Sequence, residues 1–465
     1  MNINADMMKA LTRFAPRGVV SAASMQAIDK NADAYVPAAQ RMEAAGAALA
    51  DEIRAESADS VLFVCGAGNN GGDGLCAARH LAGEMEVSVC LPQAPKTPDA
   101  AAQLHALRGT EVRLCSDFPN EAPGIVVDCL LGTGARTPLN EPYASLVSKI
   151  NASGARIISA DIPTPGVLAN KTVAFHLAKS EGAVVRKIGI PLAAEIFCGD
   201  GDLLLVPKKP AASHKGAGGS VLIIGGGPYQ GAPFLAGMAA LRAGADLVRV
   251  ATPAPAANAA AFAPDLIIEK LEGAVIGREH EEKLCALASA ADCVVAGPGL
   301  GTAPESLAAA ASAVACAKKA VVDADLLRSP LPRARDITLY TPHAGEFARC
   351  FGEVPPDLAR RGIAVRAAAG DAVILLKGKE DVIADGMRVK FNTSGCAAMT
   401  VGGTGDVLSG LCGGLMCRMP AFEAACAAAY ALGKAGEAAA GEVGEGLAAS
   451  DLLKKIAGIL YHCHT

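Results

Sequence analysis

The length, composition and charge of the chain exclude several classes of protein. Its 465 residues predict about two to four domains. The formal net charge of −5 gives no electrostatic reason to expect binding to nucleic acid or to an anionic membrane. The longest largely apolar runs, 307–317 and 407–417, are shorter than the ~18 residues of a membrane-spanning helix, and the N-terminus has no apolar signal core. We therefore expect a soluble, cytoplasmic protein.

Short β-branched runs alternate with alanine-rich helical stretches along the chain. In the first half, the predicted strands are 61–65, 87–91, 125–128 and 157–161. In the second half, they are 221–224, 247–251, 293–296, 320–323, 338–340 and 373–376. Continuous apolar strands separated by helices predict mainly parallel sheets that are covered by helices on both faces.

The segment 207–213 separates the two halves. It contains two prolines, two lysines and small residues, a composition typical of a linker. We place the domain boundary near residue 210, which gives domains 1–209 and 210–465. Each domain is long enough for a core of its own. The predicted fold class is α/β with two doubly wound domains.

A glycine turn at 402–406, with the sequence GGTGD, precedes the apolar run 407–411. Glycines let backbone N–H groups approach an anion, and a following helix would direct its positive N-terminal end to the same point. Asp406 would then lie beside a bound phosphate, where it could take a proton from a substrate hydroxyl. The turn by itself is equally compatible with a glycine-rich helix start that Asp406 caps.

In the first half, polar residues follow the predicted strands at the ends where doubly wound sheets bind ligands. A glycine-rich turn at 66–74 contains Asn70, Asp128 ends the third strand, and Asp161 and Thr164 follow the fourth. Such side chains are costly to bury without partners, so a bound ion or polar ligand is the simplest explanation. The oxygens of Asn70, Asp128 and Thr164 suit a hard cation better than zinc.

The fifteen cysteines are scattered and mostly flanked by alanine, leucine or valine. This pattern is typical of reduced, buried thiols in a cytosolic enzyme and not of a disulfide framework. The terminal sequence His462-Cys463-His464 hints at a metal site. Three potential ligands at a chain end, with no second group of ligands nearby in the sequence, give only weak support for a metal site.

Several motifs in both halves carry a resemblance to a known family. They are 41–46, 65–74 with its GNNGGDG core, 128–134 and 161–163 in the first half, and 214–216, 231–233, 240–244, 297–301, 323–325, 341–346, 377–378 and 402–406 in the second. The first half resembles the NAD(P)H-hydrate epimerase domain, which is Rossmann-like. The second half resembles the ADP-dependent NAD(P)H-hydrate dehydratase, a ribokinase-like domain. Nearly the whole chain is similar to the bifunctional NAD(P)H-hydrate repair enzymes of bacteria and archaea.

The resemblance implies that the substrate is a damaged cofactor, NADHX or NADPHX, in which water has added across the nicotinamide 5,6-double bond. The epimerase domain would interconvert the R and S hydrates. The dehydratase would restore NADH or NADPH from the S form while converting ADP to AMP. The residue chemistry agrees, because hydroxide is a poor leaving group and an anion cradle with a nearby base suits phosphorylation of the C6 hydroxyl. The implied cofactors are potassium in the epimerase domain and magnesium with ADP in the dehydratase domain.

The resemblance also gives roles to residues of the second half. Asp406 is implied as the base, or as the group that orients the hydrate hydroxyl. Ala232, Gly299 and His343 would line the hydrate side of the site. The nucleotide would be bordered by Lys377, Gly378, Lys379, Glu380 and Asp381, and held by the cradle Gly402, Gly403, Thr404 and Gly405. Asp323 and Asp325 end a strand and are left as possible caps.

In the first half, Asp161 is implied as the catalytic acid or base, and Asn70, Asp128 and Thr164 as potassium ligands. Two segments would hold the pyrophosphate and sugars of the hydrate through backbone N–H groups. They are Asn69, Asn70, Gly71, Gly72 and Asp73, and Gly132, Thr133, Gly134, Ala135, Arg136, Thr137 and Pro138.

The chain departs from the family pattern after Asp161-Ile162-Pro163. Thr164-Pro165-Gly166 stands where the family usually has Ser-Gly, and the acidic loop that follows is short. Threonine keeps the hydroxyl, but Pro165 removes a backbone donor and fixes φ. These changes predict an altered or weakened epimerase site.

Two alternative functions remain open from the sequence. The second half could be a ribokinase-like kinase of a small alcohol, although this would not explain the fused GNNGGDG half. The first half could be a non-catalytic binding domain, although Asn70, Asp128 and Asp161 are retained. We expect small-molecule ligands, no nucleic-acid or membrane partner, and a homo-oligomer.

Overall fold

The computed structural model describes residues 5–120, 123–214 and 216–462, and it divides into two compact units. The N-terminal unit is Pro16–Glu195. The C-terminal unit begins at Ile196 and also includes the segment up to Ala15. The units therefore divide before the predicted boundary near residue 210, and the segment up to Ala15 lies with the second half of the chain.

Contacts near the end of the C-terminal sheet explain both differences from the prediction. The Cys198 N–H donates to the Phe391 carbonyl at 2.8 Å, and the Lys390 ammonium lies 2.5 Å from Asp202 Oδ1. The ring of Phe14 packs edge-on against Phe391, with 5.5 Å between the ring centroids. A proline-rich segment marks a break in regular structure, whereas the division into units is set by contacts such as these.

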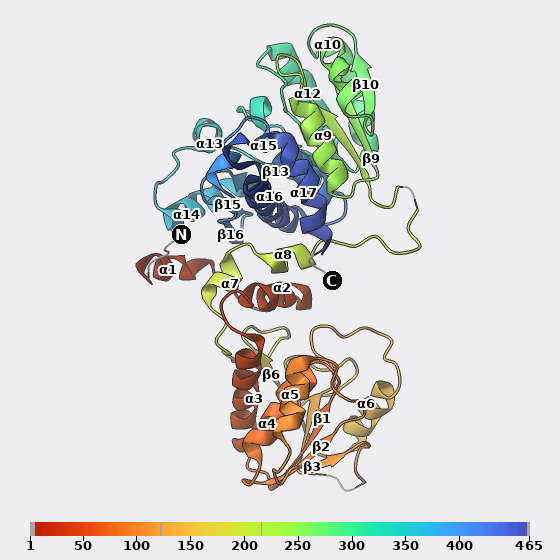
Figure 1. Ribbon diagram of the computed structural model, residues 1–465, viewed down its shortest axis with the longest axis vertical. Coiled ribbons are helices and arrows are strands. Elements are labelled where there is room, and N and C mark those ends of the chain that lie inside the picture. Colours follow the sequence, from red (N-terminus) through yellow and green to blue (C-terminus); the bar gives the residue numbers. More distant parts are fainter. Residues whose placement is uncertain (1–4, 121–122, 215, 463–465) are drawn as a thin grey trace. The chain divides into compact units, whose positions relative to one another are not determined.

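The N-terminal unit contains, in the described residues, a seven-stranded parallel sheet in the order β3-β2-β1-β4-β5-β6-β7. Figure 1 labels its strands β1, β2, β3 and β6. The connections leave β1 toward one edge and return at β4 on its other side, so the switch point lies between β1 and β4. The strands are β1 (Ser60–Cys65), β2 (Glu86–Cys90), β3 (Arg113–Cys115), β4 (Ile125–Cys129), β5 (Arg156–Ala160), β6 (Lys171–Phe175) and β7 (Val184–Arg186). The helices are α2 (Ala22–Ala32), α3 (Ala38–Arg54), α4 (Asn69–Leu81), α5 (Pro98–Ala106) and α6 (Tyr143–Ala152), and α7 (Leu192–Ile196) crosses the division.

The C-terminal unit contains, over the same described ranges, a nine-stranded sheet in the order β10-β9-β8-β11-β12-β13-β14-β15-β16. It is parallel up to β14, and β15 and β16 add to it as antiparallel strands. Its switch point lies between β8 and β11. The strands are β8 (Ser220–Ile224), β9 (Leu247–Pro253), β10 (Ile267–Leu271), β11 (Cys293–Ala296), β12 (Lys319–Val322), β13 (Ile337–Tyr340), β14 (Val373–Leu376), β15 (Asp381–Ala384) and β16 (Val389–Asn392).

The helices of the C-terminal unit follow most of these strands in βαβ order. They are α1 (Ala5–Leu11), α8 (Asp200–Leu204), α9 (Ala232–Arg242), α10 (Ala254–Ala257), α11 (Glu281–Ala290), α12 (Pro304–Cys316), α13 (Ala344–Phe351), α14 (Leu358–Ala369), α15 (Thr404–Met416), α16 (Ala421–Val443) and α17 (Ala449–His462). The predicted α/β class with mainly parallel sheets is confirmed. Every predicted strand is present, within one or two residues at each end.

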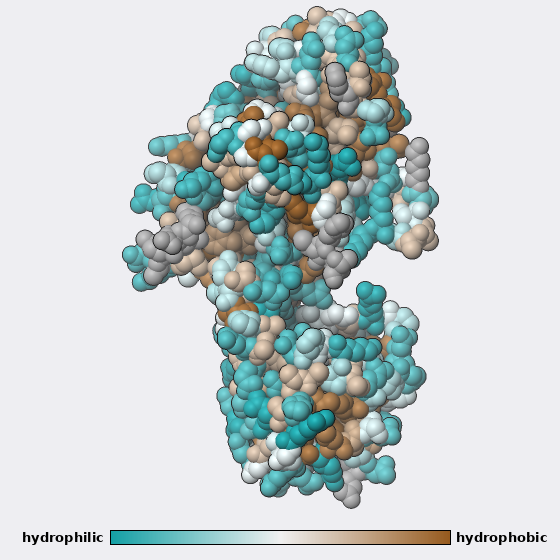
Figure 2. Space-filling view, in the orientation of Figure 1, coloured by the Kyte–Doolittle hydropathy of each residue, from teal (hydrophilic) through white to brown (hydrophobic). Residues whose placement is uncertain are grey.

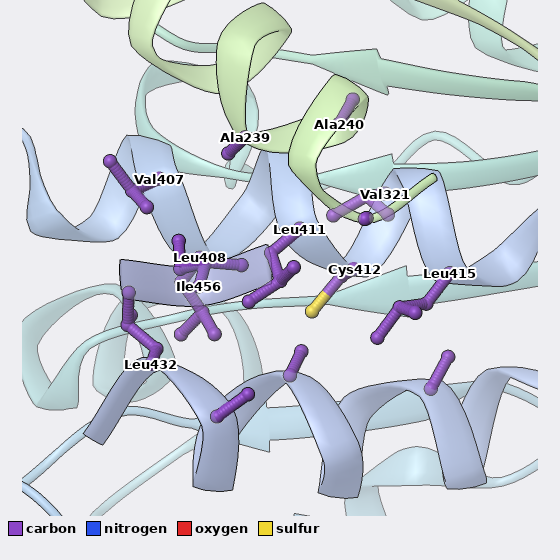
Figure 3. Packing of buried hydrophobic residues seen from close by; sticks show 14 of the residues in the cluster. Ala239, Ala240, Val321, Val407, Leu408, Leu411, Cys412, Leu415, Leu432 and Ile456 are labelled. Atoms are coloured by element: carbon purple, nitrogen blue, oxygen red, sulfur yellow. The ribbon is translucent and has the colours of Figure 1, made fainter. Parts of the chain in front are cut away.

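The helix α15 is packed between α9 and α16 (Figure 3). A Cβ atom at Gly410 would lie 2.0 Å from the Ala236 carbonyl oxygen, so only glycine lets α15 and α9 approach this closely. The buried α15 side chains shown there are Val407, Leu408, Leu411, Cys412 and Leu415. Because the apolar helix is held on both sides, the position of its N-terminal end is fixed.

The surface carries no extended apolar band in the view of Figure 2, where hydrophobic residues form small separate groups among hydrophilic ones. Tyr229 and Met387 are among the exposed large hydrophobic residues. Within the described ranges, no helix is both long and apolar enough to cross a bilayer.

Candidate active sites

Asp406 lies in the first turn of α15, directly after the glycine turn. Gly403, the residue before the helix, has φ 98°, a left-handed conformation that glycine adopts without steric cost. A Cβ atom at Gly403 would also lie 2.7 Å from Leu235 Cδ1. The turn therefore presents the N-terminal N–H groups of α15 and the Asp406 carboxyl group at the same end of the helix.

A largely buried ion pair lies next to this turn. Lys377 follows β14 and Asp323 follows β12, and Lys377 Nζ is 2.8 Å from Asp323 Oδ1. A Cβ atom at Gly405 would be 3.4 Å from Lys377 Nζ, which places the ammonium group against the turn. Burial alone would lower the pKa of Lys377, but nearby carboxylates, Asp323 first, outweigh it and raise the pKa above its ordinary value. The cradle therefore has a fixed positive charge beside it.

The ionisation of Asp406 is shifted toward neutral pH. Burial raises its pKa to about 7, and the charges of Asp323 and Asp325 act in the same direction while Lys377 opposes them. A carboxyl group with this pKa is suited to accept a proton near neutrality. Asp325 lies after β12, at the same end of the sheet as Asp323, and its Oδ2 accepts a hydrogen bond from the Gly301 N–H at 2.9 Å. Asp323 and Asp325, left as possible caps by the sequence, thus contribute to the electrostatics of the site.

The structure brings together Ala232 and Gly299 at the switch point between β8 and β11. Gly299 has φ 66°, and a Cβ atom there would lie 2.2 Å from the Tyr229 carbonyl oxygen and 3.2 Å from Ala232 Cβ. A Cβ atom at the neighbouring Gly297 would lie 1.9 Å from the Asp323 carbonyl oxygen. These close approaches connect the predicted hydrate side to the strand end that carries Asp323.

His343 lies on the other side of Asp323, between β13 and α13. Its ring Nδ1 accepts a hydrogen bond from the Gly345 N–H at 3.0 Å, and the backbone N–H of His343 donates to Glu346 Oε2 at 2.8 Å. The imidazole is thus a helix cap, and 60% of its side-chain surface is exposed. A backbone bridge between His343 and Lys377 places it next to the ion pair.

The predicted nucleotide segment after Lys377 forms the tight connection between β14 and β15. The Gly378 N–H donates to Asp381 Oδ1 at 3.0 Å, and Asn392 Nδ2 donates to Asp381 Oδ2 at 2.9 Å. Burial raises the pKa of Asp381 to about 6. The Asp381 carboxyl group is thus used to hold this hairpin, and Lys379 is exposed at its turn. Of the five predicted nucleotide residues, Lys377 is the one whose side chain the structure brings close to the turn that carries Asp406.

In the N-terminal unit, Asp128, near the C-terminal end of β4, meets Thr164, which follows β5. Asp128 is fully buried and accepts hydrogen bonds of 2.7–3.2 Å from Leu130 N, Ser159 Oγ, Thr164 N and Thr164 Oγ1. Burial raises the pKa of Asp128, although these hydrogen bonds act to lower it. The threonine that replaces the usual serine therefore still brings its hydroxyl to Asp128.

Asn70 is buried beside the loop that follows β4. Neither atom of its amide group has a hydrogen-bond partner among the described residues. A Cβ atom at Gly132 would lie 3.7 Å from Asn70 Oδ1, and Leu131 N donates to Thr164 Oγ1 at 3.1 Å in the same loop. A buried amide without partners is costly, and a bound ligand would satisfy it. The amide, carboxylate and hydroxyl oxygens of Asn70, Asp128 and Thr164 fit a hard cation.

The predicted hydrate segments have different structures. The first, residues 69–73, is the first turn of α4, so the glycine-rich turn is partly a helix start. A Cβ atom at Gly71 would lie 1.9 Å from the Gly66 carbonyl oxygen, which fixes this helix end against β1. Its N–H groups suit a phosphate. The second, residues 132–138, is a more exposed loop in which Gln26 Nε2 donates to the Thr133 carbonyl at 2.9 Å, and Arg136 is exposed.

Asp161 follows β5 with φ 66°, a strained conformation for a residue other than glycine. Its Oδ1 accepts hydrogen bonds from the Phe175 N–H and from Lys179 Nζ, and Lys179 Nζ also donates to the Phe175 carbonyl at 2.7 Å. The Lys179 side chain is 1% exposed. Sequence reasoning missed Lys179, because no motif surrounds it and only folding brings it to Asp161.

Two further carboxyl groups interact electrostatically with Asp161. Burial raises the pKa of Asp29, on α2, to about 6, and the charge of Asp161 acts in the same direction. Burial also raises the pKa of Asp73 well above its usual range, again with a contribution from Asp161. Burial thus favours the neutral acid form of both groups. No motif points to Asp29, which precedes every motif of this half.

Comparisons with known proteins identify the family of each unit. A family profile described as YjeF-related protein N-terminus matches residues 38–180, and one described as NAD(P)H-hydrate dehydratase matches residues 221–457. The solved ADP/ATP-dependent NAD(P)H-hydrate dehydratase of Bacillus subtilis, co-crystallised with ATP and Mg²⁺, is similar with a TM-score of 0.52 and 28% identity, over 58% of this chain and 98% of that one. The C-terminal unit is therefore a ribokinase-like domain of the NAD(P)H-hydrate dehydratase class.

Full-length relatives unite the two units in one chain. The bifunctional NAD(P)H-hydrate repair enzyme Nnr of Methanospirillum hungatei is 44% identical over 98% of this chain and 96% of its own length. The enzyme of the same name from Archaeoglobus fulgidus is 40% identical over 96% of this chain and 99% of its own length. The chain belongs to the family of bifunctional NAD(P)H-hydrate repair enzymes. The predicted family and its pairing of an epimerase domain with a dehydratase domain are confirmed.

Proposed function

We propose that the N-terminal unit interconverts the R and S hydrates of NADH and NADPH, and that the C-terminal unit dehydrates the S hydrate while ADP becomes AMP. The position of Asp406 carries this proposal. Its carboxyl group, with a pKa of about 7, stands at the anion-binding start of α15 beside the Lys377 ammonium. A base, a phosphate cradle and a cation thus converge where a hydroxyl group would be phosphorylated.

In the C-terminal unit, Asp406 accepts the C6 hydroxyl proton as the hydroxyl oxygen attacks the β-phosphorus of ADP, and AMP leaves. The C6–O bond of the phosphorylated hydrate then breaks with loss of a proton from C5, which gives the 5,6-double bond and inorganic phosphate. The N–H groups of residues 402–405 and Lys377 stabilise the charge on the transferring phosphoryl group. Magnesium bound with ADP would neutralise diphosphate charge, and Asp323 and Asp325 offer oxygen ligands of the kind it prefers.

In the N-terminal unit, Asp161 acts as the acid or base of the epimerisation, and Lys179 holds the Asp161 carboxylate in place. Asn70, Asp128 and Thr164 are the proposed potassium ligands, because the Asn70 amide is buried without a partner among the described residues. Potassium would supply a positive charge beyond the end of β4. The helix start at residues 69–73 and the loop at 132–138 would bind the hydrate.

The test is to incubate the purified chain with each hydrate epimer and ADP while following recovery of the nicotinamide absorbance. We expect one AMP and one phosphate per cofactor restored from the S hydrate. Accumulation of a stable phosphorylated product would instead indicate a small-molecule kinase. With the R hydrate, recovery should exceed the spontaneous rate in the wild type and fall to it in Asp161→Asn. Failure of the wild type to exceed that rate would make the N-terminal unit a binding domain.

We also propose a cytoplasmic homo-oligomer. Its mass in solution can be measured by light scattering, and a monomeric mass would contradict this part of the proposal.

A further inference from the structure

Three potential metal ligands meet between α3 and α4, on a part of α4 that the proposed epimerase chemistry does not use. They are Glu43 of α3 and Cys76 and His80 of α4, and their ligand atoms all lie within 4.8 Å of one another. We propose that this group, the Glu43–Cys76–His80 cluster, binds a divalent transition metal ion of the zinc type.

The packing of α3 against α4 brings the three side chains within reach of one ion. Cys76 and His80 are four residues apart, so they project from the same face of α4. A Cβ atom at Gly46 would lie 2.4 Å from Cys76 Sγ, and this glycine therefore lets α3 approach α4 at the cluster. Cys76 Sγ lies 3.4 Å from Glu43 Oε2, and His80 Nε2 lies 2.8 Å from Glu43 Oε1. Ligand atoms in a tetrahedral zinc site are separated by about 3.3–3.5 Å, as follows from its bond lengths.

The ligand chemistry selects the class of metal. A thiolate and an imidazole with one carboxylate are typical of zinc and similar ions, whereas magnesium and calcium prefer oxygen ligands alone. Glu43 and His80 are partly exposed, at 45% and 29% of their side chains, so an ion can enter from solvent. The cluster also lies toward the C-terminal end of α4, where the helix dipole favours a cation.

A cationic side chain already lies at the cluster. Arg79 Nη2 is 2.6–2.7 Å from the two Glu43 oxygens and 3.5 Å from Cys76 Sγ. The metal ion must displace this guanidinium group, which competes for the same ligand atoms. The metal ligand is the Cys76 thiolate, so metal binding must also release the thiol proton. Removing the arginine should therefore strengthen metal binding, whereas it would only weaken a purely structural salt-bridge group.

The experiment titrates the reduced, metal-free full chain with Co²⁺ and follows thiolate-to-cobalt absorption. Because His462-Cys463-His464 offers competing ligands, all variants carry alanine at these three positions. We expect one equivalent of Co²⁺, displaced by Zn²⁺. Cys76→Ser should abolish the band and His80→Gln should weaken binding at least about tenfold. Cys115→Ser, at a half-buried cysteine outside the cluster, is the matched control and should leave the band unchanged.

Arg79→Gln gives the decisive comparison. Loss of its charge-assisted hydrogen bonds to Glu43 should tighten Co²⁺ binding at least about tenfold. Zn²⁺ should also raise the thermal unfolding midpoint of the Arg79→Gln chain but not that of Cys76→Ser. The proposal is overturned if no thiolate band forms, if the band survives in Cys76→Ser, or if Arg79→Gln weakens binding.

Discussion

The Lys377 ammonium is paired with the Asp323 carboxylate at 2.8 Å, directly beside the glycine turn that begins α15. Lys377 and Asp323 follow β14 and β12, so the pair joins two strand ends of the parallel sheet. The carboxylate keeps the lysine charged, and the lysine partly offsets the effect of Asp323 on Asp406. This ion pair therefore adds to the effect of burial on the electrostatics around Asp406.

Asp406→Asn should lower dehydration of the S hydrate by roughly 10²–10⁴-fold, because it removes the proposed general base. Binding of ADP should change little, since the cradle is made of backbone N–H groups. In the wild type, activity should rise with pH through about 7, the pKa of Asp406, as the carboxylate forms. A steady-state rate profile and ADP titration measure these effects. Retention of near wild-type turnover in the variant would contradict the assigned role.

The same substitution should also change the dependence of stability on pH. The pKa of Asp406 is raised from 3.8 to about 7, so the folded state binds this proton more tightly than the unfolded state. Its contribution to stability is therefore present below pH 3.8 and is lost as the pH rises to about 7. Asp406→Asn should consequently be more stable than the wild type at pH 8, with the difference shrinking at pH 5. Thermal unfolding at both pH values measures this, and an equal difference at both would argue against it.

Lys377→Met should destabilise the C-terminal unit by about 3 kcal/mol, because it leaves the Asp323 carboxylate buried without its partner. The double variant Lys377→Met with Asp323→Asn should recover part of this loss, since no uncompensated charge remains. Denaturant unfolding of the single and double variants gives the interaction free energy. Additive losses would show that the two residues are not coupled.

Asn70→Ala and Asp128→Ala should have different effects on stability but the same effect on potassium dependence. The Asn70 amide has no protein partner among the described residues, so Asn70→Ala should cost little in sodium-free, potassium-free buffer. Asp128→Ala removes the acceptor of several buried hydrogen bonds and should destabilise the unit by at least about 2 kcal/mol. Both should abolish any increase of the unfolding midpoint by potassium. The dehydratase of the same chain, assayed with pure S hydrate, is the control and should keep its activity.

Phe14→Ala should destabilise the C-terminal unit by about 3 kcal/mol, although Phe14 lies near the N-terminus. Its ring packs against Phe391, and a Cβ atom at Gly362 would lie 2.8 Å from Phe14 Cζ. Exposed Arg13, its neighbour, is a matched control that should tolerate alanine. Unfolding followed through loss of dehydratase activity measures the effect. A loss of stability confined to the N-terminal unit, measured through epimerase activity, would contradict the assignment of Phe14 to the C-terminal unit.

The fold of both units was accessible from the sequence, because buried parallel strands are continuous apolar runs that stand out between helices. Among the strands that escaped prediction, β3, β7 and β10 are mostly exposed or half-buried and lack that signal, whereas β6, β15 and β16 are mostly buried. The compact units divide at Ile196, whereas the linker composition predicted a boundary near residue 210, because long-range contacts such as that of Cys198 with Phe391 leave no local pattern.

The sequence by itself determined the family, and its motifs contain the residues that we propose for each site: Asp406 with its glycine turn, Asp161, and the group Asn70, Asp128 and Thr164. These residues lie in motifs whose glycines and strand ends require a particular backbone, so local chemistry identifies them. Only the tertiary structure decided their partners. Lys179 reaches Asp161, and Asp323 reaches Lys377, across elements that are distant in the chain. Burial and charge interactions depend on distance in space, and they raise the pKa of Asp406. The Glu43–Cys76–His80 cluster likewise forms only because α3 packs against α4.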